Sequence, residues 1–366
     1  MAVFPGVIRS SFEGIVGELA GEPEVVAIGL IGSWARGDAS DASDFDLLVV
    51  ERSGLGYEFF EVVEWEGLPV DLNRVPWSWV GAPVSPVVDH RLREALLLHD
   101  PDGVLGWAME FVGRSYRSPG RIDVRTDDCL ATAETYLSRA SAAAIRGDLE
   151  AASLFAGMCW VPVAHVLMDI AGVPVTRRDL VWGFWRACWK LGTLDVFDWF
   201  VSGSGVARLD AAGVGKSVGL FEDLWVRVSE FMEGEGDVVG RLHGRLRREI
   251  SYLTGGLVLR RILGRVGEML GAGHFVGASA YMRGWLLPLL EGYAWVLSSS
   301  VGEKYDYTSL FRTMGEYGAS VIRDGALEVF GLEGVGEGAV LGDISGARRV
   351  VGGVRLDRRR LVEGFV

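Results

Sequence analysis

The chain is poor in cysteine. Its 366 residues include only Cys129, Cys159 and Cys188, and no two of them form a Cys-x-x-Cys pair. This usage indicates neither a disulfide framework nor a zinc site. The first residues also lack a basic stretch followed by an apolar core, which is the pattern of a secretion signal. We therefore expect a cytoplasmic protein.

Side-chain amides and lysine are scarce as well. Asn73 is the only asparagine, glutamine does not occur, and lysine supplies 3 of the 36 basic residues. Few thermolabile amides are typical of proteins from thermophiles. GC-rich coding would also favour arginine over lysine. We predict a thermophilic source, with the coding bias as the open alternative.

Positive charge is in deficit, since the net charge is −13. Much of such a surface repels phosphates, so we do not expect nucleic acid to be the main partner. A cationic small molecule or a protein suits the acidic balance better. Arginines do cluster locally, and we expect these clusters to be solvated helix faces that would bind RNA only if RNA were the acceptor. The clusters are Arg245, Arg247 and Arg248; Arg260 and Arg261; and Arg355, Arg358, Arg359 and Arg360.

One charge-free run, Ala151 to Met168, reaches the length of a membrane span. It contains Ser153, Pro162 and His165 and many small residues. We expect a central bundle helix and no membrane partner.

The most informative stretch runs from Ile31 to Val50. Asp44 and Asp46 are separated by one residue and enter the apolar run Leu47 to Val50. Side chains alternate along a strand, so the two carboxylates share one face while Phe45 and Leu47 face the core. Oxygen ligands of this kind suit Mg²⁺, which completes its shell with water and substrate phosphates.

A phosphate cradle is expected directly upstream. The aliphatic run Val25 to Ile31 predicts a buried strand that ends at Gly32-Ser33, and Trp34-Ala35-Arg36 can begin a helix. Backbone N–H groups at a helix start favour a phosphate. Gly32 lets the backbone approach closely, and Arg36 offers a guanidinium fork. We assign Gly32, Ser33, Arg36 and Ser43 to the nucleotide.

A third carboxylate follows on a predicted hairpin. Tyr57 to Trp65 and Leu68 to Val75 are expected to be strands, with Glu66-Gly67 as the turn. Asp71 lies between Val70 and Leu72 and so faces away from them. Glu64 and Glu66 are the competing candidates. Asp44, Asp46 and Asp71 together could hold two Mg²⁺ ions about 3.5–4 Å apart, with Mn²⁺ as the alternative ion.

At these residues the chain resembles the nucleotidyltransferase core of the DNA polymerase β superfamily, especially the small or aminoglycoside-type enzymes. That pattern is a Gly-Ser, a gap, Asp-x-Asp in an apolar strand and a later acid on another strand. Gly32, Ser33, Asp44, Asp46 and Asp71 match it, and the resemblance covers roughly the first hundred residues. It implies transfer of a nucleotide, with AMP from ATP as the expected donor reaction, to an acceptor hydroxyl. Asp44 and Asp46 would bridge both metals, and Asp71 would bind the metal that activates the acceptor.

We predict an α+β protein with a mixed sheet in a nucleotidyltransferase domain (1–118) and an all-helical remainder. The remainder divides into a bundle (119–235), a second bundle (236–333) and a loosely ordered or hairpin tail (334–366). Residues 87–98 are expected to be helical, with Glu94 on the solvent side. Residues 147–168 align without gaps on 273–294, which indicates either a repeat or a chance likeness of two apolar helices.

The helical part is loosely similar to the helical domains of kanamycin nucleotidyltransferases and HEPN-like proteins. That likeness implies a wall for the acceptor site or a homodimer contact. The Arg-x₅-His signature of ribonuclease-active HEPN domains is missing from both copies, so RNA cleavage is not implied. Asp128 and Glu134 are candidate general bases. The acceptor is expected to be a small molecule or a protein. A degenerate nucleotide-binding module and an RNA-directed enzyme remain the alternatives.

Overall fold

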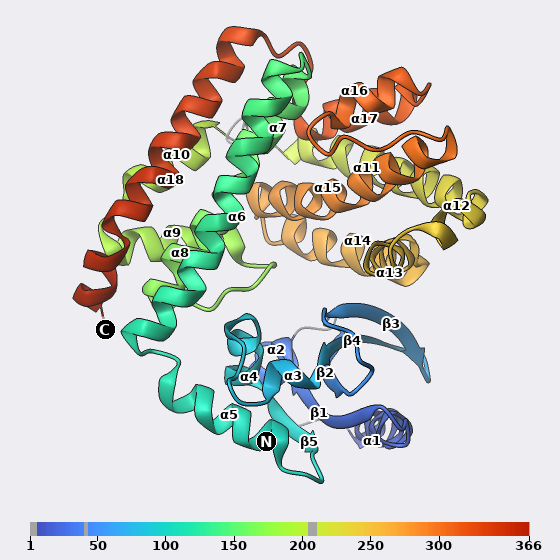
Figure 1. Cartoon of the computed structure of the whole chain (residues 1–366), viewed down its shortest axis with the longest axis vertical. Coiled ribbons are helices and arrows are strands. Elements are labelled where there is room, and N and C mark those ends of the chain that lie inside the picture. The colour runs from blue at the N-terminus through green and yellow to red at the C-terminus, as the bar shows by residue number, and fades with distance from the viewer. Residues whose placement is uncertain (1–5, 40–42, 204–210, 366) are drawn as a thin grey trace. The chain divides into compact units, whose positions relative to one another are not determined.

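A computed structural model describes residues 6–39, 43–203 and 211–365. The described elements form two compact units (Figure 1). The sheet unit contains the chain up to Arg121 together with His243–Arg261, and the helical unit contains Ile122–Leu242 and the chain from Ile262 onward. Each unit is described by itself.

The sheet unit is built on a five-stranded mixed sheet in the order β3-β4-β2-β1-β5. Strands β2 and β4 are parallel, and the other neighbours are antiparallel. Every residue of β1 is buried, as its aliphatic sequence requires. The strands are β1 (Val25–Ile31), β2 (Phe45–Glu51), β3 (Phe59–Trp65), β4 (Leu68–Pro76) and β5 (Leu96–His99).

The hairpin between β3 and β4 turns at Glu66 and Gly67, which have φ angles of 48° and 80°. Two consecutive positive φ angles are typical of a type I′ turn, whose backbone twist matches that of the flanking strands. Strand β5 corrects the expectation of a helix over 87–98. The helix α4 (Asp89–Glu94) ends at Glu94, and Leu96 to His99 pair with β1 instead. The pairing sites offered by the edge of β1 override the helix propensity of three consecutive leucines.

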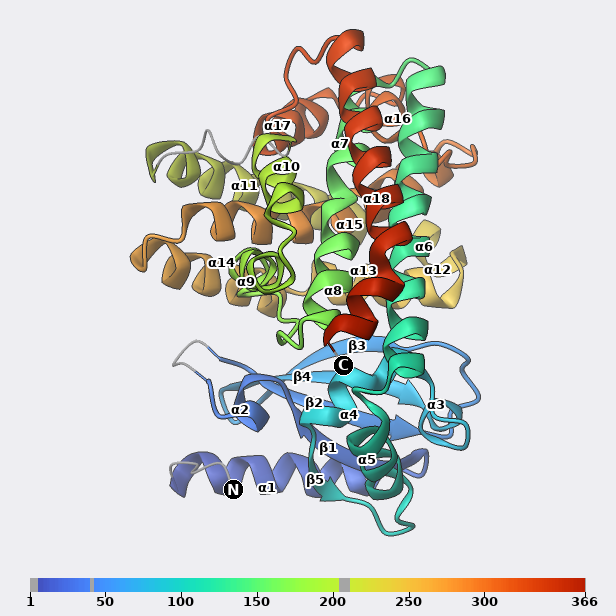
Figure 2. The ribbon, with the colours of Figure 1, turned by 90° about the vertical axis from the view of Figure 1, so that its left-hand side faces the viewer.

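Helices cover both faces of the sheet (Figure 2). Phe12, Ile15 and Leu19 of α1 pack with Ile28 and Leu47 on one face. On the other face α3, α4 and α5 pack against side chains such as Leu48 and Val50. These elements are α1 (Gly6–Ala20), α2 (Gly32–Arg36), α3 (Trp77–Val80), the 3₁₀ turn η1 (Pro86–Val88), α4 and α5 (Val104–Ser115).

A segment from far along the chain belongs to the sheet unit. The helix α13 (Gly244–Thr254) packs on β3, where the Tyr252 and Phe60 ring centroids are 5.7 Å apart and Arg248 lies 4.0 Å from the centroid of Phe59. The next helix, α14 (Gly256–Gly271), begins in the sheet unit and continues into the helical unit. Residues 243–261 thus group with the sheet, although the sequence had suggested a second bundle over 236–333.

The helical unit contains only helices among its described residues, which confirms the α+β class. The predicted division into two repeated bundles stays a prediction. Of the two aligned segments, the first is split into α7 and α8 at Cys159, and the second belongs from Phe275 onward to the continuous α15. The helices, with α14 completing the set, are α6 (Pro119–Ile145), α7 (Leu149–Met158), α8 (Trp160–Ile170), α9 (Leu180–Leu191), α10 (Leu194–Gly203), α11 (Ala211–Gly234), α12 (Gly236–Arg241), α15 (Phe275–Ser300), α16 (Leu310–Glu316), α17 (Ser320–Phe330) and α18 (Glu337–Phe365).

The C-terminal segment is an ordered helix of 29 residues, so the expected loose tail or hairpin is wrong. Figure 2 shows α18 running beside α6, α7 and α8. Apolar residues along one side of α18, including Val340, Ile344 and Val351, are buried. Arg358 Nη1 lies 3.0 Å from an Asp127 carboxylate oxygen. Packing of this apolar face outweighs the low helix propensity of the glycines that suggested a tail.

The charge-free run corresponds to α7 and α8. Leu149–Ile170 has the length and hydropathy of a membrane span, but 72% of its most apolar window is buried inside the protein. Burial to this extent is what a core helix achieves. The absence of a membrane partner stays a prediction.

Candidate active site

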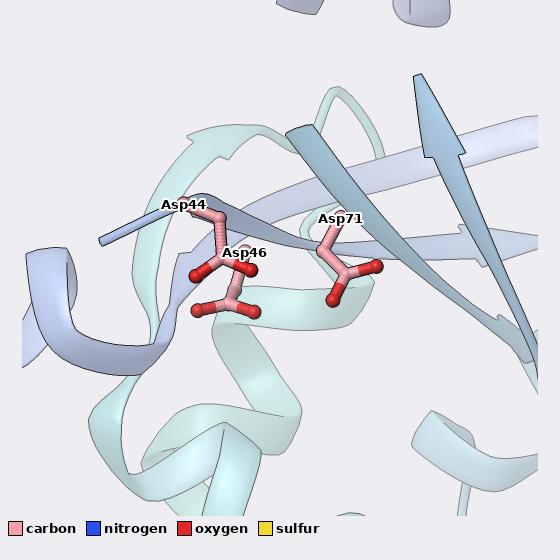
Figure 3. A group of neighbouring side chains, drawn as sticks. All are labelled: Asp44, Asp46 and Asp71. Atoms are coloured by element: carbon pink, nitrogen blue, oxygen red, sulfur yellow. The ribbon is translucent and has the colours of Figure 1, made fainter. Parts of the chain in front are cut away.

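Three carboxylates meet where β2 and β4 run side by side (Figure 3). The parallel register pairs Asp46 with Asp71, and Asp44 precedes β2 on the same face as Asp46. One oxygen from each of the three lies within 4.8 Å of the others, and the three residues are partly buried. We call this set the acidic cluster. Glu64 and Glu66, the competing candidates, lie on β3 and in the hairpin turn and are not part of it.

The cluster is electrostatically costly. Burial raises the pKa of Asp46 well above its usual range, and the negative charges of Asp44 and Asp71 raise it further. Burial also raises the pKa of Asp71, against the opposing pull of the Arg261 guanidinium. Three carboxylates this close repel one another, and burial removes the water that would screen the repulsion.

A guanidinium from the distant segment enters the cluster. Arg261 Nη1 donates to Asp44 Oδ2 at 2.8 Å and also to Asp71 Oδ2. Its Nη2 donates to the Tyr252 hydroxyl at 2.6 Å. The Tyr252 hydroxyl in turn donates to Asp71 Oδ2 at 3.3 Å. The Arg261 side chain is 9% exposed, so this is a buried ion pair and not the solvated helix face expected from the sequence.

The acidic cluster fits a divalent cation. Its donors are all carboxylate oxygens, the set that Mg²⁺ and Mn²⁺ prefer. Asp71 Oδ1 is buried and has no hydrogen-bond partner among the described residues. A positive group already approaches two of the three acids. A buried oxygen without a partner is rare in native proteins, and a bound ion would satisfy it.

In the predicted phosphate cradle, the Glu94 carboxylate takes the place expected for a phosphate. The Gly32 N–H donates to Glu94 Oε1 at 2.9 Å, and Arg36 Nη1 donates to Glu94 Oε2 at 2.7 Å. Both side chains of this ion pair are about three-quarters buried, at 24% and 23% exposure. The Glu94 carboxylate thus already accepts hydrogen bonds from the two groups that we assigned to phosphate.

Gly32 has two reasons to be glycine. Its φ is 73°, in the left-handed region. A Cβ at this position would lie 2.1 Å from Asp46 Oδ2. Trp34 stacks on Phe45 with ring centroids 4.8 Å apart, which fixes α2 against β2. The cradle and the acidic cluster therefore touch at Gly32 and Asp46.

The two predicted serines differ in what the structure shows of them. Ser33 is buried at the start of α2. The Ser43 carbonyl accepts a hydrogen bond from Trp34 Nε1 at 3.4 Å. Residues 40–42 lie outside the described residues. The roles of Ser33 and Ser43 toward a nucleotide stay predictions.

Sequence reasoning missed three residues of this site. Glu94 had been placed on a solvent face, Arg261 in a basic stretch, and Tyr252 was not singled out. No local signal marks them, because Arg261 lies 190 residues from Asp71 along the chain. Of the candidate general bases, Glu134 forms an ion pair with Arg355 at 2.6 Å in the helical unit. The role of Asp128 and Glu134 stays a prediction.

Residues 10–95 match the family model of the nucleotidyltransferase domain. The match includes the acidic cluster, Gly32, Arg36 and Glu94 but not Tyr252 or Arg261. No curated protein matches the chain. Among solved structures, the chain is similar to a nucleotidyltransferase-like protein from Exiguobacterium sibiricum, with 14% identity over 90% of this chain and 96% of that chain, and a TM-score of 0.33.

Proposed function

We propose that this protein transfers a nucleoside monophosphate, AMP from ATP in the expected case, to a hydroxyl of a small molecule or a protein. The observation that carries the proposal is the meeting of Asp44, Asp46 and Asp71 beside Gly32, inside the segment that matches the nucleotidyltransferase domain. Mg²⁺ is the proposed ion, because the donor set is all carboxylate.

In this proposal Asp44, Asp46 and Asp71 hold the metal ions, which neutralise charge on the phosphates and lower the pKa of the acceptor hydroxyl. Gly32 contributes its backbone N–H, and Arg36 its guanidinium, to the triphosphate. Glu94 must release both groups first. The acceptor oxygen bonds to the α-phosphorus, the bond to pyrophosphate breaks, and the hydroxyl proton leaves to a base or to water. The chain's contribution is positioning and charge, as is general for phosphoryl chemistry.

The test combines nucleotide binding with a label-transfer assay. Each α-³²P-labelled NTP is incubated with the protein, Mg²⁺ and the small-molecule or the protein fraction of a cell extract. We expect label from ATP in one fraction, with a loss of about a thousandfold in Asp44→Asn and Asp46→Asn. Glu64→Gln is the matched control, because it removes a nearby carboxylate outside the acidic cluster, and it should retain activity.

Transfer that survives both aspartate variants would refute the proposed site. Label that moves to an added RNA and to neither fraction would favour the RNA-directed alternative. Binding of no NTP, with or without Mg²⁺, would refute the enzyme proposal as a whole.

One observation favours a second candidate, a nucleotide-binding module without transfer. The ion pairs of Arg261 with Asp44 and Asp71 give these acids a countercharge inside the protein. Such an internal countercharge would let a site without transfer activity retain these two acids. Tight Mg²⁺-dependent binding of an NTP, without transfer to any fraction, would identify this second function.

A further inference from the structure

The guanidinium of Arg261 lies where a bound cation would lie in the acidic cluster. A single nitrogen, Nη1, donates to carboxylate oxygens of both Asp44 and Asp71, and a positive centre that bridges two acids is also what a bound metal would be. The acids are 13% and 14% exposed, so water screens this interaction only weakly.

Tyr252 keeps the guanidinium in this place. Its hydroxyl accepts from Arg261 Nη2 at 2.6 Å and donates to Asp71 at 3.3 Å. Its ring is fixed in turn against Phe60 of β3. The contact is therefore built by two residues of the same distant segment, and it is not one flexible side chain that happens to reach an acid.

A guanidinium and a divalent cation cannot share these oxygens. The two positive groups would repel each other in a poorly solvated space, and the carboxylate oxygens offer a limited number of lone pairs. At Asp71, the oxygen Oδ2 already accepts from both Arg261 and Tyr252. Any cation that binds the cluster must compete with Arg261.

We propose that Arg261 is an internal counter-ion that closes the metal site and is expelled when a divalent cation binds. The inference rests on the proposed function only in taking such a cation as the ligand of the cluster. Arg261 and Tyr252 lie outside the residues that match the nucleotidyltransferase domain, so this closure is a property of the added segment His243–Arg261. Arg261 belongs to α14, which continues into the helical unit. When a cation expels Arg261, the first turns of α14 therefore lose their ion pairs with Asp44 and Asp71.

The test is a titration of the full chain with Mn²⁺, without nucleotide or acceptor. The concentration of unbound Mn²⁺ is measured by electron paramagnetic resonance. We expect Arg261→Met to bind Mn²⁺ about tenfold or more tightly than the wild type, since an adjacent opposite charge changes the proton affinity of a carboxylate by about one to three log units. Tyr252→Phe, which loosens Arg261 but leaves it present, should give a smaller gain.

Arg248→Met is the matched control. Arg248 belongs to the same segment and is 3.9 Å from Glu61, but it does not contact the acidic cluster. It should bind Mn²⁺ as the wild type does. A gain in this variant as large as that of Arg261→Met would mean that lost net charge, and not competition at the site, causes the effect, and would overturn the proposal.

The proposal is also overturned if Arg261→Met folds, as judged by an unchanged circular dichroism spectrum, and binds Mn²⁺ no more tightly than the wild type. If Arg261→Met does not fold, Tyr252→Phe decides by the same criterion. Binding by the variant alone, with none by the wild type, would support it. Failure of label transfer together with a tighter Mn²⁺ site would contradict the proposed function and leave this inference standing.

Discussion

Two arginines of the sheet unit, Arg74 and Arg261, each lie among carboxylates and are each about one-tenth exposed. Arg74 uses all three guanidinium nitrogens. Its Nε donates to Glu61 at 2.7 Å, Nη1 and Nη2 donate to the two oxygens of Glu22 at 2.8 and 3.1 Å, and Nη1 reaches Glu51 at 3.4 Å. In Arg261, the nitrogen Nη1 donates to both Asp44 and Asp71, and Nη2 donates to the Tyr252 hydroxyl.

The acids differ more than the arginines do. Glu22 and Glu61 are 40% and 41% exposed, so water shares their charge. The acids of the acidic cluster have oxygens within 4.8 Å of one another, and one Asp71 oxygen has no partner in the part of the chain that the structure describes. An ion pair that stabilises a fold satisfies its members, whereas a binding site keeps unsatisfied charge at a cost in stability. The four predictions below test this distinction, from the largest expected effect to the smallest.

The largest effect is expected where the acidic cluster itself is deformed. Gly32→Ala places a Cβ 2.1 Å from Asp46 Oδ2. Displacing a catalytic group by about 1 Å can cost about a hundredfold in rate, and we expect a loss of similar size in Mn²⁺ affinity. Gly37→Ala is the control. Gly37 has a similar φ of 80° but nothing within 4 Å of its added Cβ. Equal losses in both variants would attribute the effect to backbone strain.

The next prediction separates the two arginines directly. Arg74→Met leaves Glu51, which is 6% exposed, without its guanidinium, and we expect it to lower the free energy of unfolding by about 2 kcal/mol, the typical cost of a buried acceptor that loses its donor. Calorimetry in EDTA should show a lower Tm for Arg74→Met and also for Arg261→Met. Mn²⁺ should restore the Tm only for Arg261→Met. If it restores both or neither, the distinction between a structural and an exchangeable ion pair is wrong.

A pH series tests the cost of the crowded acids. The raised pKa of Asp46 means that the folded state holds its proton more tightly than the unfolded state. This contribution to stability is full below the unfolded-state pKa and is lost as pH rises through the folded-state pKa. In EDTA, Asp46→Asn should therefore exceed the wild type in Tm at neutral pH by about 2–4 °C, with the difference shrinking toward acid pH. Asp102→Asn, at an exposed acid, should show no such trend. A constant difference at all pH values would contradict the prediction.

The smallest effect is expected at the cradle. Glu94→Gln removes the carboxylate that holds the Gly32 N–H and Arg36. A partly exposed ion pair is worth about 0.5–1 kcal/mol, so metal-free ATP measured by calorimetry should bind about two- to fivefold more tightly. Glu66→Gln, in the hairpin turn, controls for the lost negative charge. Unchanged or weaker ATP binding in Glu94→Gln would mean that Glu94 does not occupy the anion position.

Some parts of the fold could be predicted because their signals are local. The alternation of apolar residues around Asp46 and Asp71 sets their strands and their faces, and Glu66-Gly67 sets the hairpin turn. Strand β5 could not be recognised, because three leucines fit a helix or a strand equally and only the edge of β1 decides between them. Helix α18 was missed because its glycines lower helix propensity locally, while its stability comes from packing on α7 and α8.

From the residues alone one could read which acids share a face, where the chain turns, and that the first hundred residues resemble a nucleotidyltransferase core. These are properties of neighbours in the chain, and side-chain alternation and turn chemistry encode them. The groups that occupy the site depend on how the chain folds. Glu94 at the cradle and Arg261 at the acidic cluster come from 62 and 217 residues away. An ion pair between distant residues leaves no periodic mark in the sequence, because it depends on distance in space and on the exclusion of water.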